Sequence, residues 1–301
     1  MKLHCIPILS ALFTSLVCFS NPATKISDNS PSSGIVIRWN DCEQTIDGFG
    51  IAQAGWAKEL FAFKNRKQVM DKMFGNDGLR LNILRGEIFP HYWENKEDKD
   101  FNLNDDINIE LCDSDFNNKS DDLLRRGQLW LTLEAKNKYH INKLVFSTWS
   151  APAWMKSNGK VSNGKLKPEC YQDFANYLAA FYKAYKSKGI TPYAISPSNE
   201  PGYAAPWNSS LWTADEMGKF ITSNLGPTFQ KENIPAKIIF GENPLWSVVM
   251  PQLKMVSSKD FTDTILQDYP EIKKFNLIAA GHGYSLSPDI MPIKVDKEYL
   301  K

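Results

Sequence analysis

The segment Tyr193-Ala194-Ile195-Ser196-Pro197-Ser198-Asn199-Glu200-Pro201 places an amide and a carboxylate directly after a short apolar run. Tyr193 and Ile195 are typical of a buried strand, and the prolines indicate that a loop follows it. In a parallel barrel, the carboxyl ends of the strands are where catalytic groups lie. Asn-Glu-Pro is equally compatible with an ordinary turn, because Asn and Pro are common turn residues. The surrounding sequence decides between these interpretations.

Further apolar runs also end in polar or aromatic residues, as strands that lead into a site do. These runs are 81–84 before Arg85, 144–148 before Trp149, and 275–280 before His282 and Tyr284. Amphipathic segments alternate with them and with another run at 237–242. The expected helices are 59–74, 121–139, 168–188 and 213–232. This alternation predicts an α/β fold, a (β/α)8 TIM barrel of which about six βα units are present.

Several ordered motifs give the chain its resemblance to glycoside hydrolase family 30, a family of retaining enzymes in the large barrel clan. The motifs are Gln44–Gly50, Arg85, Trp149–Met155, Asn199-Glu200-Pro201 and His282-Gly283-Tyr284. The resemblance implies a barrel over residues 44–301 that lacks its seventh and eighth strands. It also implies that residues 34–43 form a strand of a β-sandwich side domain that is otherwise missing.

The resemblance further implies roles for individual residues. Glu200 resembles the catalytic acid/base, and the other matching side chains resemble residues that bind substrate. The expected substrate-binding residues are Arg85, Trp149, Asn199, His282, Tyr284, Trp154 and Trp207. Trp212 is a weaker candidate of the same kind, because most aromatic residues of a barrel pack in its core.

A retaining hydrolase needs a second carboxylate, about 5–5.5 Å from the first, as nucleophile. In the family this is a Glu at the end of the seventh barrel strand, and no such motif follows Tyr284. Glu298 lies in a charged stretch that resembles a surface segment, so the nucleophile is expected beyond Lys301 and this chain alone is expected to be inactive. Glu242 is a further candidate for substrate binding, whereas Glu87 is expected to pair with Arg85 or another base.

The composition excludes several other classes of function. Lys and Arg total 35 and Asp and Glu total 34, so no basic footprint for nucleic acid is present. Four scattered His residues and the absence of metal-ligand spacing among the cysteines predict no metal site, and no cofactor is expected. After removal of a leader, Cys42, Cys112 and Cys170 would allow at most one internal disulfide.

The N-terminus has the layout of a secretory signal peptide. Residues 1–20 carry Lys2 and His4 before a short apolar run, and residues 21–33 are rich in Ser, Asn and Pro, as in a flexible leader. We therefore expect export to the periplasm, the cell surface or the medium, with no membrane span after cleavage. Lipidation at Cys18 is the alternative, although the residue before it is not small.

The sequence thus predicts a secreted, monomeric retaining hydrolase of a β-linked polysaccharide. Residues 154–159 and 202–207 most resemble the xylanase-like members, so xylan or glucuronoxylan is the first substrate. A β-1,6-glucanase, a galactanase or a glucosylceramidase is the alternative within the family. The alternative from another class is a non-catalytic, carbohydrate-binding barrel that has lost its nucleophile.

Overall fold

The computed structural model describes residues 40–41, 45–53, 56–93, 95–97, 127–247 and 256–284. The predicted signal peptide, the leader and most of the predicted sandwich strand lie outside these residues. Cys42, Cys112 and Glu298 also lie outside them.

The described strands form one parallel sheet in which spatial order follows chain order, β1 to β6. The strands are β1 (Gly50–Ala52), β2 (Ile83–Ile88), β3 (Lys143–Thr148), β4 (Ala194–Ser196), β5 (Lys237–Asn243) and β6 (Leu277–Gly281). Every neighbouring pair is parallel, with registers such as Ile83 opposite Lys143. This sequential parallel order confirms the predicted fold class, a partial (β/α)8 barrel.

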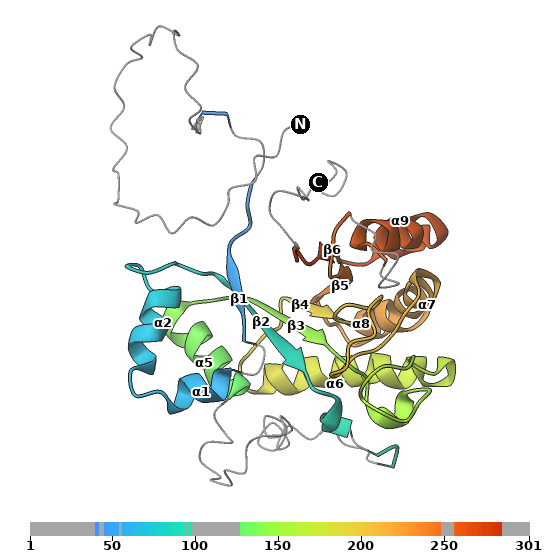
Figure 1. Ribbon diagram of the computed structural model, residues 1–301, viewed down its shortest axis with the longest axis horizontal. Helices are drawn as coiled ribbons and strands as arrows, with labels where there is room; N and C mark the ends of the chain where they lie inside the picture. The colour runs from blue at the N-terminus through green and yellow to red at the C-terminus, as the bar shows by residue number, and fades with distance from the viewer. Residues whose placement is uncertain are drawn as a thin grey trace, which may run out of the picture.

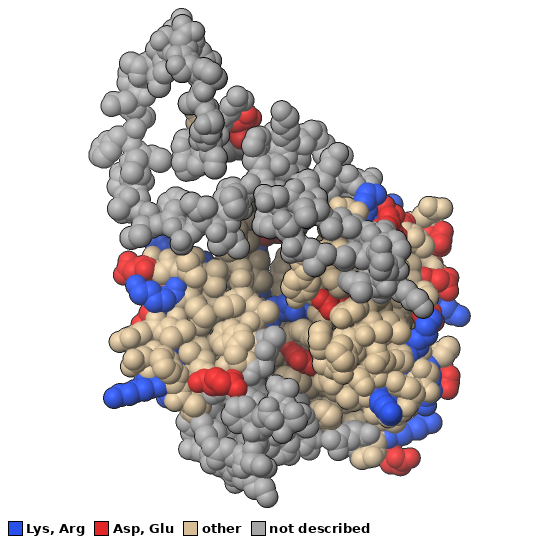
Figure 2. Space-filling model, in the orientation of Figure 1, with Lys and Arg blue, Asp and Glu red and all other residues tan. Residues whose placement is uncertain are grey.

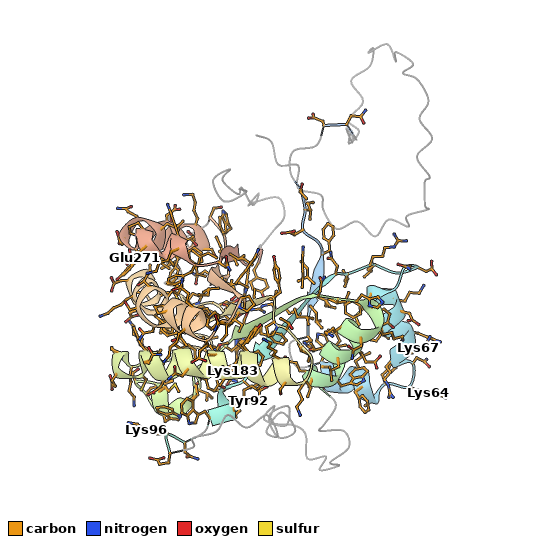
Figure 3. The ribbon with its side chains drawn as sticks, turned by 180° about the vertical axis from the view of Figure 1, so that it is seen from behind. Lys64, Lys67, Tyr92, Lys96, Lys183 and Glu271 are labelled. Atoms are coloured by element: carbon orange, nitrogen blue, oxygen red, sulfur yellow. The ribbon has the colours of Figure 1, made fainter. Side chains whose placement is uncertain are left out.

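Helices connect the strands and lie in an arc around the outside of the sheet (Figure 1). The α-helices are α1 (Ala57–Ala62), α2 (Arg66–Phe74), α5 (Gln128–Tyr139), α6 (Tyr171–Ser187), α7 (Ala214–Phe220), α8 (Gly226–Lys231) and α9 (Ser258–Asp268). Short 3-10 helices are η1 (Pro90–Trp93), η3 (Ala153–Met155), η4 (Pro168–Cys170) and η7 (Pro270–Lys274), and η5 (Ile221–Leu225) is a π-helix. Figure 3 shows Lys64, Lys67 and Glu271 at the periphery of this helical layer.

The expected first helix, 59–74, is two helices in the structure. Phe63 adopts an extended conformation with ψ 126° and ends α1. Arg66 then begins α2, and its guanidinium donates a 2.6 Å hydrogen bond to the carbonyl of Phe61 while covering that residue's ring. A side chain of the second helix therefore satisfies one of the carbonyls left open at the end of the first.

The expected helix 213–232 is continuous but changes its hydrogen-bonding pattern in the middle. Thr213 and Glu216 form a capping box at its start. Pro227 has no N–H to donate to a carbonyl one turn earlier, and the π-helical turn η5 ends at Leu225, two residues before it. A proline inside an otherwise helical pattern thus changes the local winding without ending the helix.

The core lies between the sheet and the helices and is rich in aromatic side chains. Phe146 of β3 is 1% exposed and makes edge-on contacts with Phe181 and Tyr185 of α6, at ring-centroid distances of 5.1 and 5.0 Å. Trp212 is buried against Phe174 and Phe220, so this candidate is a core residue. Within the described part of the chain, no helix has the length and apolar character needed to cross a membrane.

Replacing Phe146 with Ala is expected to lower the free energy of unfolding by about 3–5 kcal/mol, because a buried ring leaves a cavity between β3 and α6. Urea denaturation followed by tryptophan fluorescence measures the loss. The matched control is Phe63→Ala, since Phe63 is 51% exposed and its loss should cost less than about 1 kcal/mol. Equal losses in the two variants would contradict this assignment of the core.

Candidate functional site

Side chains from five successive strands, most of them at or near the carboxyl end of the strand, meet on the inner side of the curved sheet. They are Arg85 of β2, Ser147 of β3, Ser196 of β4, Glu242 of β5 and His282, which directly follows β6. Arg85 and Glu242 belong to strands that are not neighbours in the sheet, yet their side chains are in contact. The sheet must therefore curve enough to bring β2 and β5 within reach across its concave face.

Glu200 lies in the turn that follows β4, and backbone hydrogen bonds tie this turn to both neighbouring strands. The amide of Asn199 donates to the carbonyl of Thr148 at 2.7 Å, and the amide of Glu200 donates to the carbonyl of Glu242 at 3.1 Å. Glu200 has a φ of 50°, in the left-handed region that non-glycine residues seldom adopt, and is 7% exposed. This strained turn fixes the direction of the Glu200 side chain.

Arg85 is held by several polar groups and by an aromatic ring. One guanidinium nitrogen donates to Asn199 Oδ1 at 2.7 Å and to Glu242 Oε1 at 2.6 Å, and Nε donates to Ser147 Oγ at 3.2 Å. The guanidinium carbon lies 4.5 Å from the centroid of the Trp149 ring. Four predicted site residues, Arg85, Trp149, Asn199 and Glu200, therefore lie together, with Arg85 as the link between strands.

Glu242 is the buried anion of this cluster, and its side chain accepts bonds from three elements. It is 4% exposed, and it accepts hydrogen bonds from Arg85, from Ser147 and from Ser196. Burial by itself raises the pKa of Glu242, but the charge of Arg85 and the bonds from His282 and Ser196 outweigh burial and lower the pKa to about 2. Glu242 is therefore a carboxylate at neutral pH.

His282 lies between the two carboxylates. Its Nδ1 is 2.9 Å from Glu200 Oε1, and its Nε2 is 3.6 Å from Glu242 Oε1. Burial by itself lowers the pKa of His282, but the hydrogen bond to Glu200 and the nearby negative charge of Glu242 outweigh burial and raise the pKa. The Tyr284 ring stands perpendicular to His282, with centroids 5.3 Å apart, and is 64% exposed.

The remaining predicted tryptophans lie in different surroundings. Trp154 is half-buried, donates its indole N–H to the carbonyl of Trp93 at 2.9 Å and packs edge-on against that ring. Trp207 is 53% exposed and lies beside Tyr203, at a centroid distance of 6.3 Å. Trp154 therefore packs within the segment that follows β3, while Trp207 presents an exposed aromatic ring on the loop that follows β4.

A buried lysine joins the loops that follow β3 and β4. Lys156 is 1% exposed, and its Nζ donates to Ser150 Oγ at 3.1 Å and to the carbonyl of Ser209 at 2.7 Å. Burial lowers its pKa to about 8. The amides of Ser209 and Leu211 donate to the carbonyls of Val161 and Gly164, so the two loops, one of which carries Trp207, are joined into one unit. The sequence motif around Trp154 gave no sign of this contact.

Charges of both signs are scattered over the face in Figure 2, near its centre as well as at its edge, with no large patch of one sign. Within the described residues, no group of three or more His, Cys, Asp or Glu side chains is placed to hold a metal ion. Cys170 is buried and forms no disulfide with any described residue. Glu200, beside the fixed side chains of Arg85, His282 and Glu242, is a carboxyl group of the kind that serves as a general acid or base.

Comparison with protein families places the chain among known barrels. The sequence pattern described as "Glycosyl hydrolase family 30 TIM-barrel domain" matches residues 46–270, more than half of the chain. Among solved structures, an endo-β1,6-glucanase superposes with a TM-score of 0.63 at 23% identity, covering 82% of this chain and 54% of that one. This likeness shows the fold.

Curated relatives carry several activities in their names. Glucosylceramidase 3 of Caenorhabditis elegans is 30% identical over 80% of this chain and 45% of its own length. The endo-1,6-β-D-glucanase of Neurospora crassa is 28% identical over 73% and 45%, and the glucuronoxylanase XynC of Bacillus subtilis is 30% identical over 54% and 35%. The chain thus spans less than half the length of these relatives.

Replacing Arg85 with Gln is expected to lower the free energy of unfolding by about 3–5 kcal/mol near pH 7, because Glu242 would remain buried without its cation. The depressed pKa of Glu242 contributes stability above its unfolded value of about 4.3 and loses it as the pH falls toward 2. The loss in the variant should therefore shrink below about pH 4.5. Urea denaturation across this pH range measures both effects.

The control for this prediction is Arg80→Gln, which removes an exposed arginine whose described hydrogen bond is to the carbonyl of Asn76. It should change stability by less than about 0.5 kcal/mol at every pH. A loss in Arg85→Gln that is as small as this, or that grows on acidification, would contradict the buried ion pair.

Proposed function

Because the chain belongs to glycoside hydrolase family 30, we propose that it is part of the catalytic barrel of a retaining β-glycoside hydrolase in which Glu200 is the general acid/base. The observation that carries the proposal is the position of Glu200 at the carboxyl end of β4. Its Oε1 lies 2.9 Å from His282, and its neighbour Asn199 is hydrogen-bonded to Arg85. Catalytic groups of barrel enzymes lie at this end of the strands.

In the proposed reaction, Glu200 acts twice. It first donates a proton to the glycosidic oxygen while a second carboxylate attacks the anomeric carbon and the bond to the leaving sugar breaks. It then removes a proton from the water that hydrolyses the glycosyl-enzyme, which restores both carboxyl groups. We propose that the attacking carboxylate comes from outside the described residues, beyond Lys301 in the complete protein.

Glu242 does not suit the part of the attacking carboxylate. Both of its oxygens accept hydrogen bonds, from Arg85 and Ser147 on one oxygen and from Ser196 on the other, and the residue is 4% exposed. A nucleophile must present an oxygen to the anomeric carbon, and a carboxylate held in this way has none directed to open space. Glu242 is better suited to fixing the positions of Arg85, Ser147 and Ser196 through these hydrogen bonds.

For the substrate we propose xylan or glucuronoxylan first, with β-1,6-glucan, β-1,6-galactan or a glucosylceramide as the alternative. The rim supports a polymeric substrate, because Trp207 and Tyr203 form an aromatic surface on loops that Lys156 holds together. Flat apolar faces of sugars stack on such rings. The export predicted from residues 1–20 would bring a monomeric enzyme into contact with such a polymer.

Glu200→Ala, introduced into the protein that contains this chain, is expected to abolish cleavage of polysaccharide. Loss of general acid catalysis lowers the reaction rate about 10²–10⁴-fold. The phenolate of an activated aryl glycoside leaves without receiving a proton, so formation of the glycosyl-enzyme should persist on this substrate, and azide should restore turnover. A reducing-sugar assay measures cleavage of the polysaccharide, and release of nitrophenol measures cleavage of the aryl glycoside.

The matched control for this variant is Glu232→Ala, whose side chain pairs with Lys183 on the outer surface and which should behave as wild type. Polysaccharide cleavage by Glu200→Ala at the wild-type rate would exclude Glu200 from the proposed role. Polysaccharide binding without any hydrolysis by the unsubstituted complete protein would favour a non-catalytic carbohydrate-binding barrel.

Trp207→Ala is expected to lower kcat/KM for a polysaccharide by about 2–10-fold, because a stacking contact is worth about 0.5–1.5 kcal/mol. In this proposal Trp207 stacks on the outer sugar units of a polymer, so kcat/KM for a small aryl glycoside should stay unchanged. Parallel assays on xylan and on β-1,6-glucan identify the preferred polymer. The control Phe63→Ala removes an exposed aromatic ring on the outer helices and should affect neither substrate. Equal losses on both classes of substrate would refute the stacking role.

A further inference from the structure

Glu242 occupies an unusual backbone position at the end of β5. Gly241 pairs with Ala280 and Asn243 pairs with Gly281, so Glu242 is an extra residue in the ladder, a β-bulge. Glu242 has a φ of 44°, and Gly241 before it has a φ of 94°. Such bulges redirect a side chain, and left-handed backbone in a non-glycine residue costs about 1–3 kcal/mol. A strained conformation at this place indicates a function for the side chain that it directs.

The position before the bulge admits only glycine. A Cβ on Gly241 would lie 2.6 Å from the carbonyl oxygen of Ala280 and 2.8 Å from Thr262 Oγ1. The backbone is thus pressed against β6 and α9, and the bulge cannot relax toward regular pairing. The Glu242 carboxylate is therefore fixed on the inner face, where Arg85, Ser147 and Ser196 bind it.

His282 is positioned by the same segment. Its amide donates to the carbonyl of Asn243 at 2.8 Å, one residue after the bulge. Among the described residues, the charged and titratable groups that face its ring are Glu200 after β4, Glu242 on β5, Arg85 on β2, and Tyr284 from its own segment. The two carboxylates lie at opposite nitrogens of the ring, so a doubly protonated imidazolium matches both.

We propose that Glu242 is a positioning residue that acts on Glu200 through His282. Its buried charge keeps His282 protonated and turned so that Nδ1–H donates to Glu200, and its bond to Arg85 keeps that side chain on Asn199. This inference rests on the proposed function of Glu200. When Glu200 gives its proton to the leaving oxygen it becomes a carboxylate, and the His282 N–H then stabilises the new charge while His282 keeps its own proton.

The test uses the titration of His282, which NMR can follow because the chain contains four histidines. In the unsubstituted protein the midpoint should lie above the ordinary value of 6.5. Glu242→Gln removes the charge but keeps the shape, and it should lower the midpoint by about 1 pH unit. Glu242→Asp keeps the charge, so its His282 midpoint should lie between those of Glu242→Gln and the unsubstituted protein. Glu232→Gln, on the outer surface, should leave the midpoint unchanged.

Activity assays on the complete protein give the second readout. Glu242→Gln should move the alkaline limb of the pH profile of kcat/KM to lower pH by the same amount as it lowers the His282 midpoint. It should also reduce kcat about 10-fold or more while changing KM by no more than about 2-fold. A merely structural role would change stability without moving this limb.

The proposal is overturned if His282 titrates at or below 6.5 in the unsubstituted protein, or if Glu242→Gln leaves the midpoint unchanged. The first measurement needs no variant, so it decides the matter even if Glu242→Gln fails to fold. Glu200→Gln separates the two hypotheses. If that variant stays active, the proposed function fails whatever His282 does. If it is inactive while Glu242→Gln moves neither midpoint nor limb, only the positioning role fails.

Discussion

The buried ion pair between Arg85 and Glu242 is the contact on which the arrangement of the site depends. Its partners come from β2 and β5, two strands separated in the sheet by β3 and β4. Two buried charges are costly unless they are paired and hydrogen-bonded, and here Ser147 and Ser196, from the intervening strands, complete the shell of Glu242. The pair thus requires a curved sheet, and the curvature in turn places the other strand ends around it.

Two residues of the site, one of them a member of this pair, have strained backbone conformations. Glu200 and Glu242 both adopt left-handed backbone conformations, and the amide of Glu200 donates to the carbonyl of Glu242. The turn after β4 and the bulge in β5 therefore hold each other. Strain of this kind persists where surrounding contacts determine the conformation, and it gathers at sites that need fixed side chains. His282 lies between the two carboxylates because its own amide is bonded next to the bulge.

The proposed reaction depends on the cluster around Glu200, whereas the proposed substrate depends on the loops around Trp207. In the proposed function, the cluster of Arg85, Glu200, Glu242 and His282 is assigned the acid–base chemistry on a glycosidic bond, whichever sugar is bound. The rim around Trp207 belongs to loops that Lys156 joins through Ser150 and Ser209. The relatives carry the names of a glucosylceramidase, a glucanase and a xylanase. Differences in such loops, on one barrel, are how this fold accommodates different substrates.

The sequence by itself determined two strands closely, since apolar runs ending in polar residues predicted 144–148 and 237–242 within one residue of β3 and β5. It ended the run 81–84 before Arg85, whereas Arg85 lies inside β2, Ile83–Ile88. The same logic anticipated that Arg85, Asn199, Glu200 and His282 would come together, because parallel strands end on one side. It did not give the partner of Arg85: Glu87 was expected to pair with Arg85 or another base, and the carboxylate paired with Arg85 in the structure is Glu242. Only the tertiary structure decided this, because strand curvature and the bulge set which side chains meet across the sheet, and neither leaves a local pattern in the chain.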